Sequence, residues 1–185
     1  MRTRAFSSLL ALSTLGLAGC TTPGPRPSAA PGVVVSSITV TSHSFGANGS
    51  IPIDHTCDGK ELSPQLTWSS PPEGTKSLAV VVEDPDASRT NFTHWLVFNL
   101  PAELTQIGEG ADLAAVHGTI GTNDSPDTRY LGPCPPRGEM HRYVFRVFAL
   151  NAQLPLHEGA TRAAVDAAMS GHVLGEGLLI AKFGH

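Results

Sequence analysis

The sequence predicts a single, mainly β domain with little helix, and three observations lead to that expectation. Several short apolar segments rich in Val, Ile, Phe, Trp and Thr recur between clusters of Pro, Gly, Ser and Asp, as strands do between turns. Only one segment has a helical pattern, and no internal repeat is present. The 185 residues are 41% hydrophobic with a net charge of −4, which suits one ordinary globular domain. We therefore expect a sandwich-like arrangement of sheets.

The elements follow from local composition. The central apolar segments hardly alternate with polar residues, which indicates strands covered on both faces. The helix is expected over residues 159–171, with Thr161 as its N-cap and Gly171 near its end. The expected strands, in chain order, span residues 33–40, 66–68, 78–83, 94–100, 141–150 and 177–183.

Residues 1–20 have the composition of an export signal. Arg2 and Arg4 precede an apolar stretch, and small residues precede Cys20. The stretch has about 13 apolar or small residues, too few for a helix that spans a bilayer core. The run LAGC at 17–20 resembles the lipobox of bacterial lipoproteins, which implies a diacylglyceryl group on Cys20 and a membrane anchor. Simple secretion and a buried structural cysteine are the alternatives.

Residues 21–32 predict a tether, because they are rich in Pro, Gly, Ala, Ser and Thr and carry one charge. An extended tether of this kind reaches roughly 35 Å at about 3 Å per residue. The folded domain is then expected over residues 33–185. These segments together predict a bacterial envelope protein, held at a membrane with its domain on the extracytoplasmic side.

Cys57 and Cys134 remain as an even pair once Cys20 is assigned to lipid. Export to an oxidising compartment allows a disulfide between them, and closing a loop of 77 positions would stabilise the fold by about 4 kcal/mol. Two buried thiols would give the same sequence signature. A metal site on these two is less expected, because neither lies in a C-x-x-C pair.

The charge pattern excludes nucleic acid as an expected partner. The 12 Lys and Arg residues are scattered, with no basic run and no basic stripe interleaved with aromatic residues. The most distinctive loop is instead the Gly- and Pro-rich connection over residues 109–140. A loop of that length in a compact domain often forms a binding surface.

Ionisable residues stand at the mouths of three predicted strands. Asp84 and Asp86 follow the strand at 78–83, His94 opens the next strand, and His141 opens another after the long loop. Antiparallel pairing of the first two strands would bring the aspartates and His94 to one rim of the sheet. The plainer alternative is that D-P-D is a turn and that each histidine is solvated.

A pocket formed by these groups would suit a small anion. A carboxylate that accepts a hydrogen bond from an imidazole favours the cationic ring and fixes which nitrogen faces the cavity. Backbone amides of the Gly-rich loop at 130–138 could add further donors to the anion.

Several motifs carry a resemblance to a known family. Their order and spacing resemble those of the phosphatidylethanolamine-binding protein family, and most closely its bacterial Raf kinase inhibitor-like branch of the YbhB and YbcL type. The resemblance covers nearly all of residues 38–183, and the combination is more specific than any motif alone. The motifs are CDGKELSPQLTW, VVVEDPDAS, HWLVFNLPA, GTND, GPCPPRGEMHRYVFRVFAL and GHVLGEG.

The resemblance implies a fold with a central antiparallel sheet, a smaller second sheet and a short C-terminal helix. It also implies a pocket at one end of the sheet for phosphate-like groups, including the phosphoryl head group of phosphatidylethanolamine. No cofactor is implied, and a kinase or protease is a possible regulatory partner. Arg142 is expected on the opposite face of its strand. The pocket residues carried over by motif are Asp84, Asp86, His94, Pro136, His141 and Tyr143.

The leading prediction is therefore a binding protein without catalytic activity. A hydrolase that uses His94 as base and Asp84 as its orienting partner is the alternative, although no G-x-S-x-G nucleophile motif is present. A metal site is a third possibility, since two histidines and a carboxylate can form a facial triad, yet the sequence has no H-x-H spacing.

Overall fold

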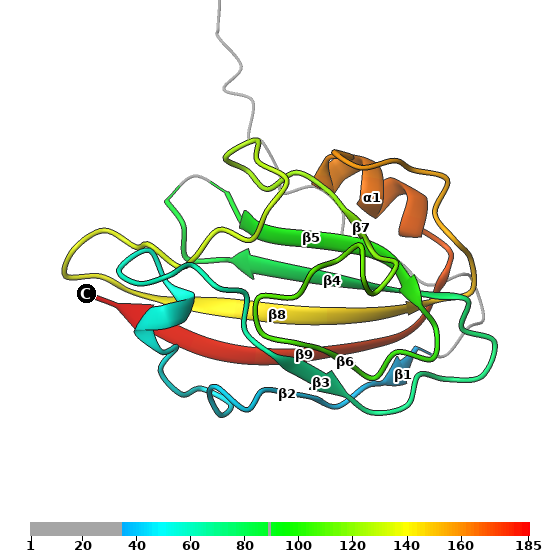
Figure 1. Cartoon of the computed structure of the whole chain (residues 1–185), viewed down its shortest axis with the longest axis horizontal. Coiled ribbons are helices and arrows are strands. Elements are labelled where there is room, and N and C mark those ends of the chain that lie inside the picture. Colours follow the sequence, from blue (N-terminus) through cyan, green and yellow to red (C-terminus); the bar gives the residue numbers. More distant parts are fainter. Residues whose placement is uncertain (1–34, 89) are drawn as a thin grey trace, which may run out of the picture.

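The computed structural model of the chain describes residues 35–88 and 90–185. The predicted signal at 1–20 with Cys20, and the predicted tether at 21–32, lie outside the described residues. Within those residues the protein is mainly β, as the sequence predicts, with a six-stranded sheet, a three-stranded sheet and one short α-helix (Figure 1).

The large sheet is antiparallel through its four long strands. Its edge strand β1 pairs in parallel with β9, so the sheet as a whole is mixed, which the expectation of an antiparallel sheet did not include. In spatial order the strands are β1 (Ser36–Ser37), β9 (Val173–Gly184), β8 (Met140–Leu150), β4 (Ser77–Asp84), β5 (Phe92–Pro101) and β7 (Thr119–Ile120).

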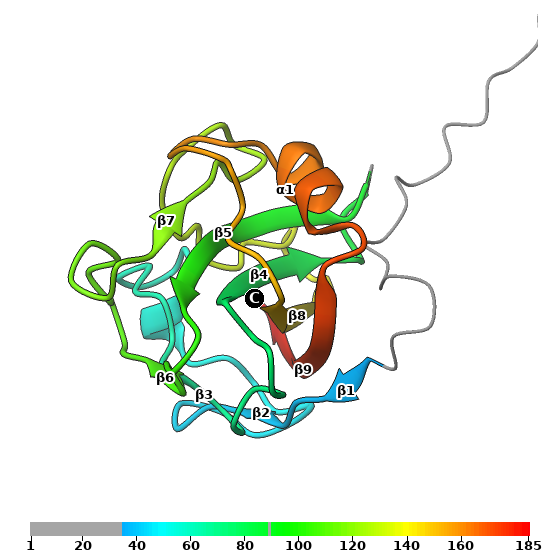
Figure 2. The ribbon, with the colours of Figure 1, turned by 90° about the vertical axis from the view of Figure 1, so that its right-hand side faces the viewer.

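The small sheet and the α-helix cover opposite faces of the large sheet (Figure 2). One core packs the small sheet against alternate residues of the long strands, and a second core packs the helix against the residues between them. The small sheet consists of β2 (Val40–Thr41), β3 (Leu66–Trp68) and β6 (Gln106–Ile107); the helices are the 3₁₀ turn η1 (Ile53–His55) and α1 (Arg162–Met169).

Helix α1 has the predicted N-cap, Thr161, but spans only Arg162–Met169 of the expected residues 159–171. The Thr161 side chain accepts a hydrogen bond from the Ala164 amide at 3.3 Å, which satisfies one of the free N–H groups of the first turn. Val165 and Met169, four residues apart, are buried against the sheet. The helix stops before Gly171, whose φ of 80° favours glycine.

The segment predicted as one strand over residues 33–40 is divided between the two sheets. Ser36 and Ser37 pair with β9, whereas Val40 pairs with Trp68 of the small sheet. The chain passes very close to β9 at the crossing point, because a Cβ on Gly177 would lie 2.1 Å from the Ile38 carbonyl oxygen. The two-residue strands β6 and β7 were not predicted, and β7 lies inside the long loop.

Strand β5 contains two bulges that alter its alternation. Val82 pairs with Trp95 and Glu83 with Thr93, so His94 is an extra residue without an opposite partner. A second shift leaves Asn99 as the extra residue, with a φ of 56°. The first bulge directs His94 to the face that also carries Trp95.

A buried ionic network lies on the helix side of the large sheet. Glu83 is 3% exposed and binds Arg146 from β8 and Arg162 from α1, while Arg146 also binds Glu176 of β9 at 2.7 Å. Burial opposes ionisation of Glu83, but the two guanidinium groups outweigh it and lower its pKa. The network therefore joins four elements through one charged carboxylate.

The close approach at Gly177 predicts a stability effect. Gly177→Ala should lower the free energy of unfolding by about 1–3 kcal/mol, because the added methyl group forces residue 38 away from β9. Gly46→Ala is the control, since a Cβ there has no heavy atom within 4 Å. Urea unfolding measures both variants, and equal stability of the two would contradict the prediction.

Candidate functional site

The candidate site lies where β4 ends and β8 begins. Asp84 is the last residue of β4, and its Oδ2 lies 2.7 Å from Nδ1 of His141 on β8. The two side chains are only 5% and 8% exposed. The other carboxylate oxygen of Asp84 accepts a hydrogen bond from the Asp86 amide at 2.8 Å, so the turn after β4 also orients it. The predicted carboxylate–imidazole pair is therefore present in the structure.

Both ring nitrogens of His141 face carboxylates. Its Nε2 lies 3.2 Å from Oε2 of Glu139, opposite the Nδ1 contact with Asp84. Ionised carboxylate oxygens only accept hydrogen bonds, so the doubly protonated ring is the form that can donate to both. Burial opposes that charge, but the hydrogen bonds to Asp84 and Glu139 outweigh it and raise the pKa of His141 above its ordinary value.

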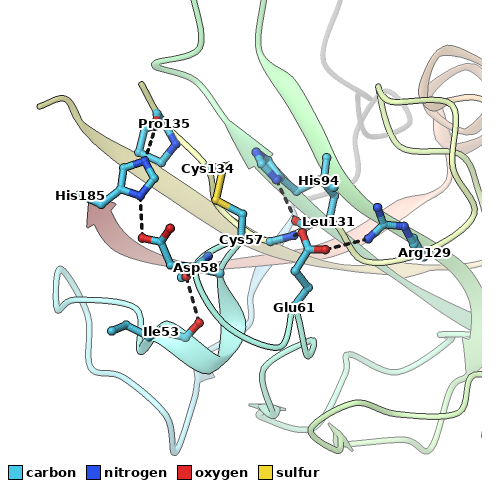
Figure 3. The surroundings of a disulfide bond; sticks show 12 residues. Ile53, Cys57, Asp58, Glu61, His94, Arg129, Leu131, Cys134, Pro135 and His185 are labelled. Atoms are coloured by element: carbon cyan, nitrogen blue, oxygen red, sulfur yellow. Dashed lines mark hydrogen bonds and ion pairs between the residues drawn. A yellow bond between two sulfur atoms is a disulfide. The ribbon is translucent and has the colours of Figure 1, made fainter. Parts of the chain in front are cut away.

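His94 lies in the same cluster but is held differently. Its Nδ1 donates to the Leu131 carbonyl at 2.9 Å (Figure 3), which leaves the lone pair on Nε2 in the neutral ring. Burial lowers the pKa of His94, so this ring favours the uncharged form. The ring meets Tyr143 edge-on, with centroids 5.3 Å apart.

Tyr143 completes the group, and its hydroxyl is unusual. Among residues 35–88 and 90–185, that hydroxyl is the buried side-chain polar atom for which no hydrogen-bond partner is present. Burial and the nearby Asp84 carboxylate raise the pKa of Tyr143, while the backbone of Cys134, also close to the hydroxyl, opposes that rise. Neither group meets the hydroxyl in hydrogen-bonding geometry. Asp84, His94, His141 and Tyr143 are called the rim cluster below.

Asp86 does not direct its carboxylate into the rim cluster. Arg142 is exposed on the opposite face of β8, as predicted, and Asp86 extends to it. The Asp86 carboxylate accepts from Nε of Arg142 at 2.8 Å and from its backbone amide at 2.9 Å. These bonds from Arg142 lower the pKa of Asp86 to about 2. This aspartate therefore holds the turn against the start of β8.

Pro136 holds the turn before β8 through its backbone carbonyl. The residue is exposed, and its carbonyl accepts from the Glu139 amide at 3.0 Å. That bond closes the turn before β8 and places Glu139 beside His141. Pro136 thus positions Glu139, a neighbour of the rim cluster.

The loop amides that were expected to donate to an anion are largely occupied. Proline has no N–H group, and most of the other amides between residues 131 and 139 already bind acceptors within the protein. The rim cluster is therefore built from side chains on strands. The occupied amides are those of Leu131, Gly132, Gly138 and Glu139, which donate to His94, Glu61, His185 and Pro136 respectively.

A disulfide holds this loop in place. Cys57 and Cys134 are bonded, with their Cα atoms 5.4 Å apart, and the bond joins the turn after η1 to the loop (Figure 3). His185 ties the same region together, because its ring contacts Asp58 at 2.6 Å and the Pro135 carbonyl at 2.9 Å.

The structure bears on the metal and hydrolase alternatives. Within the described ranges, the one group of three metal-binding side chains with ligand atoms inside 4.8 Å is Cys57, Asp58 and His185, and its sulfur is in the disulfide. The expected hydrogen bond between His94 and Asp84 of the hydrolase alternative is wrong. Asp84 binds His141, and His94 binds the Leu131 carbonyl.

Glu139 is the contact that sequence reasoning missed. It stands two residues before His141, and residues i and i+2 of an extended chain share a face, so its position was open to prediction. A cavity of about 860 Å³ lies elsewhere, over Trp95, Arg129 and Tyr130, and no rim-cluster residue lines it. No helix in residues 35–88 and 90–185 is both long and apolar enough to cross a membrane.

Comparisons with known proteins agree on one family. The family model described as Phosphatidylethanolamine-binding protein matches residues 41–184. A UPF0098 protein from Methanothermobacter thermautotrophicus is 44% identical over 149 residues, which cover 79% of this chain and 98% of that protein. A UPF0098 protein from Aquifex aeolicus is 42% identical over 78% of this chain and 86% of its own length.

Solved structures are also similar. A putative phosphatidylethanolamine-binding protein homolog from Chlamydia trachomatis superposes with a TM-score of 0.76 at 33% identity, over 81% of this chain and 99% of that one. Escherichia coli YbcL, described as a member of the mammalian PEBP family, gives a TM-score of 0.74 at 31% identity, over 80% and 98%.

The pKa values of the two histidines should be shifted in opposite directions. Nuclear magnetic resonance should place the pKa of His141 above 6.5 and that of His94 below it. Because the folded-state pKa of His141 is raised, its ionisation stabilises the fold below pH 6.5, and that contribution disappears as the pH rises through the raised value.

Asp84→Asn should lower the pKa of His141, because the amide replaces the charged acceptor. It should also reduce the stability gained on acidification, as measured by urea unfolding at several pH values. An unchanged His141 pKa in this variant would show that the contact with Asp84 does not hold the charge.

Proposed function

Because the chain belongs to the phosphatidylethanolamine-binding protein family, we propose that it is a binding protein whose rim cluster takes a phosphate-like anion. The ligand class is a phosphate or a phosphorylated small molecule, of which the phosphatidylethanolamine head group is one type. The proposed binding needs no cofactor.

The observation that carries the proposal is the Tyr143 hydroxyl. A buried hydroxyl without a partner costs free energy, and a ligand oxygen that accepts from it would recover that loss. Next to it stands the cationic ring of His141, a charge-assisted donor fixed by Asp84. Two donors of this kind on one face of β8 suit an oxyanion.

Binding without catalysis is proposed for two reasons. The thiol that could act as a nucleophile near the loop, Cys134, is in a disulfide. The sequence also has no G-x-S-x-G motif that would present a serine nucleophile. Turnover of a phosphate or carboxylate ester that disappears in His141→Gln would favour the hydrolase alternative.

The cellular setting is part of the proposal and rests on residues 1–20 alone. An export signal that ends in a lipidated Cys20 would hold the protein at a membrane of the bacterial envelope, with its domain on the extracytoplasmic side. A kinase or protease partner regulated by the domain is a further possibility that the family suggests. Mass spectrometry of the mature N-terminus tests the lipid directly.

The chain's two tyrosines with buried hydroxyls give a matched test. Tyr143→Phe should weaken binding of inorganic phosphate and of phosphoethanolamine about tenfold, because it removes one donor to a charged ligand. It should leave the free energy of unfolding unchanged or raised, since no residue among 35–88 and 90–185 forms a hydrogen bond with that hydroxyl. Isothermal titration calorimetry and urea unfolding measure the two effects.

Tyr130→Phe is the control. Its hydroxyl donates to the His55 carbonyl at 2.9 Å, so its loss should lower stability by about 1 kcal/mol and leave phosphate affinity unchanged. If wild-type protein binds neither compound at millimolar concentration, the proposed function is wrong.

A further inference from the structure

Glu139 occupies the outer nitrogen of His141, which is the position that an anionic ligand needs. Its Oε2 lies 3.2 Å from Nε2, the one ring nitrogen that Asp84 does not hold. An oxyanion hydrogen-bonded to that nitrogen would therefore take the place of a carboxylate that belongs to the protein. The ligand and Glu139 compete for the same N–H group.

Electrostatics make the competition stronger. The ionised groups of Asp84, Glu139 and His141 sum to a charge of −1, whereas Asp84 and His141 alone sum to zero. A phosphate that approached with Glu139 in place would meet a net negative site, and the repulsion acts at short range in a partly buried position. The rim cluster becomes receptive to an anion when this one carboxylate leaves.

The two partners of the contact differ in how firmly they are held. The His141 side chain is 8% exposed and packed in the sheet, while that of Glu139 is 60% exposed on the turn before β8. The backbone of this turn is fixed independently, by the bond from the Glu139 amide to Pro136 and by that from the Gly138 amide to His185. The Glu139 side chain can thus rotate into water without breaking the turn.

We propose that Glu139 is a gate on the anion site. In the unliganded protein its carboxylate takes the place of the ligand on His141, and ligand binding requires the side chain to swing outward. The inference rests on the proposed function and adds to it a residue that sets the affinity for anions.

The gate lowers the apparent affinity by the fraction of molecules in which it is open. An ion pair with a partner this exposed contributes little free energy, so the Glu139 carboxylate occupies His141 in most molecules but not in all. Removal of the carboxylate should therefore tighten phosphate binding about fivefold. Loss of the nearby negative charge adds to that gain at a pH low enough to keep His141 protonated, because Glu139 also raises the pKa of His141.

The test compares Glu139→Gln and Glu139→Ala with wild type by titration of inorganic phosphate, followed at His141 by nuclear magnetic resonance and by calorimetry. Both variants should bind phosphate about fivefold or more tightly. The matched control is Asp124→Asn. Asp124 is exposed and its charge acts on His94, but it accepts from the Thr93 amide and does not contact His141.

The outcomes separate the gate from the binding function. If wild type binds phosphate and neither Glu139 variant binds it more tightly, the gate is wrong while the proposed function stands. Equal tightening in Asp124→Asn would assign the effect to general charge and would also overturn the gate. If wild type binds neither phosphate nor phosphoethanolamine at millimolar concentration, the proposed function itself fails, and the gate that rests on it fails too.

Discussion

The hydrogen bond between Asp84 and His141 is the interaction on which the rest of the site depends. It places a carboxylate and an imidazole, both nearly out of water, at the joined ends of two central strands, where each would be costly to bury alone. Because His141 takes Asp84, His94 is left with the neutral Leu131 carbonyl. The two histidines of the rim cluster thereby have pKa values shifted in opposite directions, that of His141 upward and that of His94 downward.

The fold could be predicted from the sequence where strands are long and apolar, as in β4, β5 and β8, and where a helix has a cap such as Thr161. The short strands β6 and β7 could not, because pairing of two residues depends on tertiary contacts. The rim position of Asp84, His94 and His141 was predictable from strand order. The bulge at His94 and the choice of Asp84 partner were not, since pattern alone does not show where a ladder gains an extra residue.

The proline-rich loop contributes acceptors where donors were expected. Proline lacks an N–H group but keeps its carbonyl, and carbonyls of this loop receive bonds from His94, Glu139 and His185. The disulfide to Cys57 holds those carbonyls in position. The loop therefore sets the tautomer of one histidine and the position of the carboxylate beside the other, while strands supply the residues of the rim cluster.

The parallel pairing of β1 with β9 fixes where the domain joins the preceding chain. Ser36 lies beside Gly175, near the start of β9, whereas the rim cluster lies at the other end of that strand (Figure 1). His141 of the rim cluster pairs with Phe183, so eight steps along β9, at about 3.3 Å per residue, separate the two ends by about 26 Å. Under the proposed anchoring through Cys20, the chain would therefore enter the domain at the end of the large sheet opposite the rim cluster.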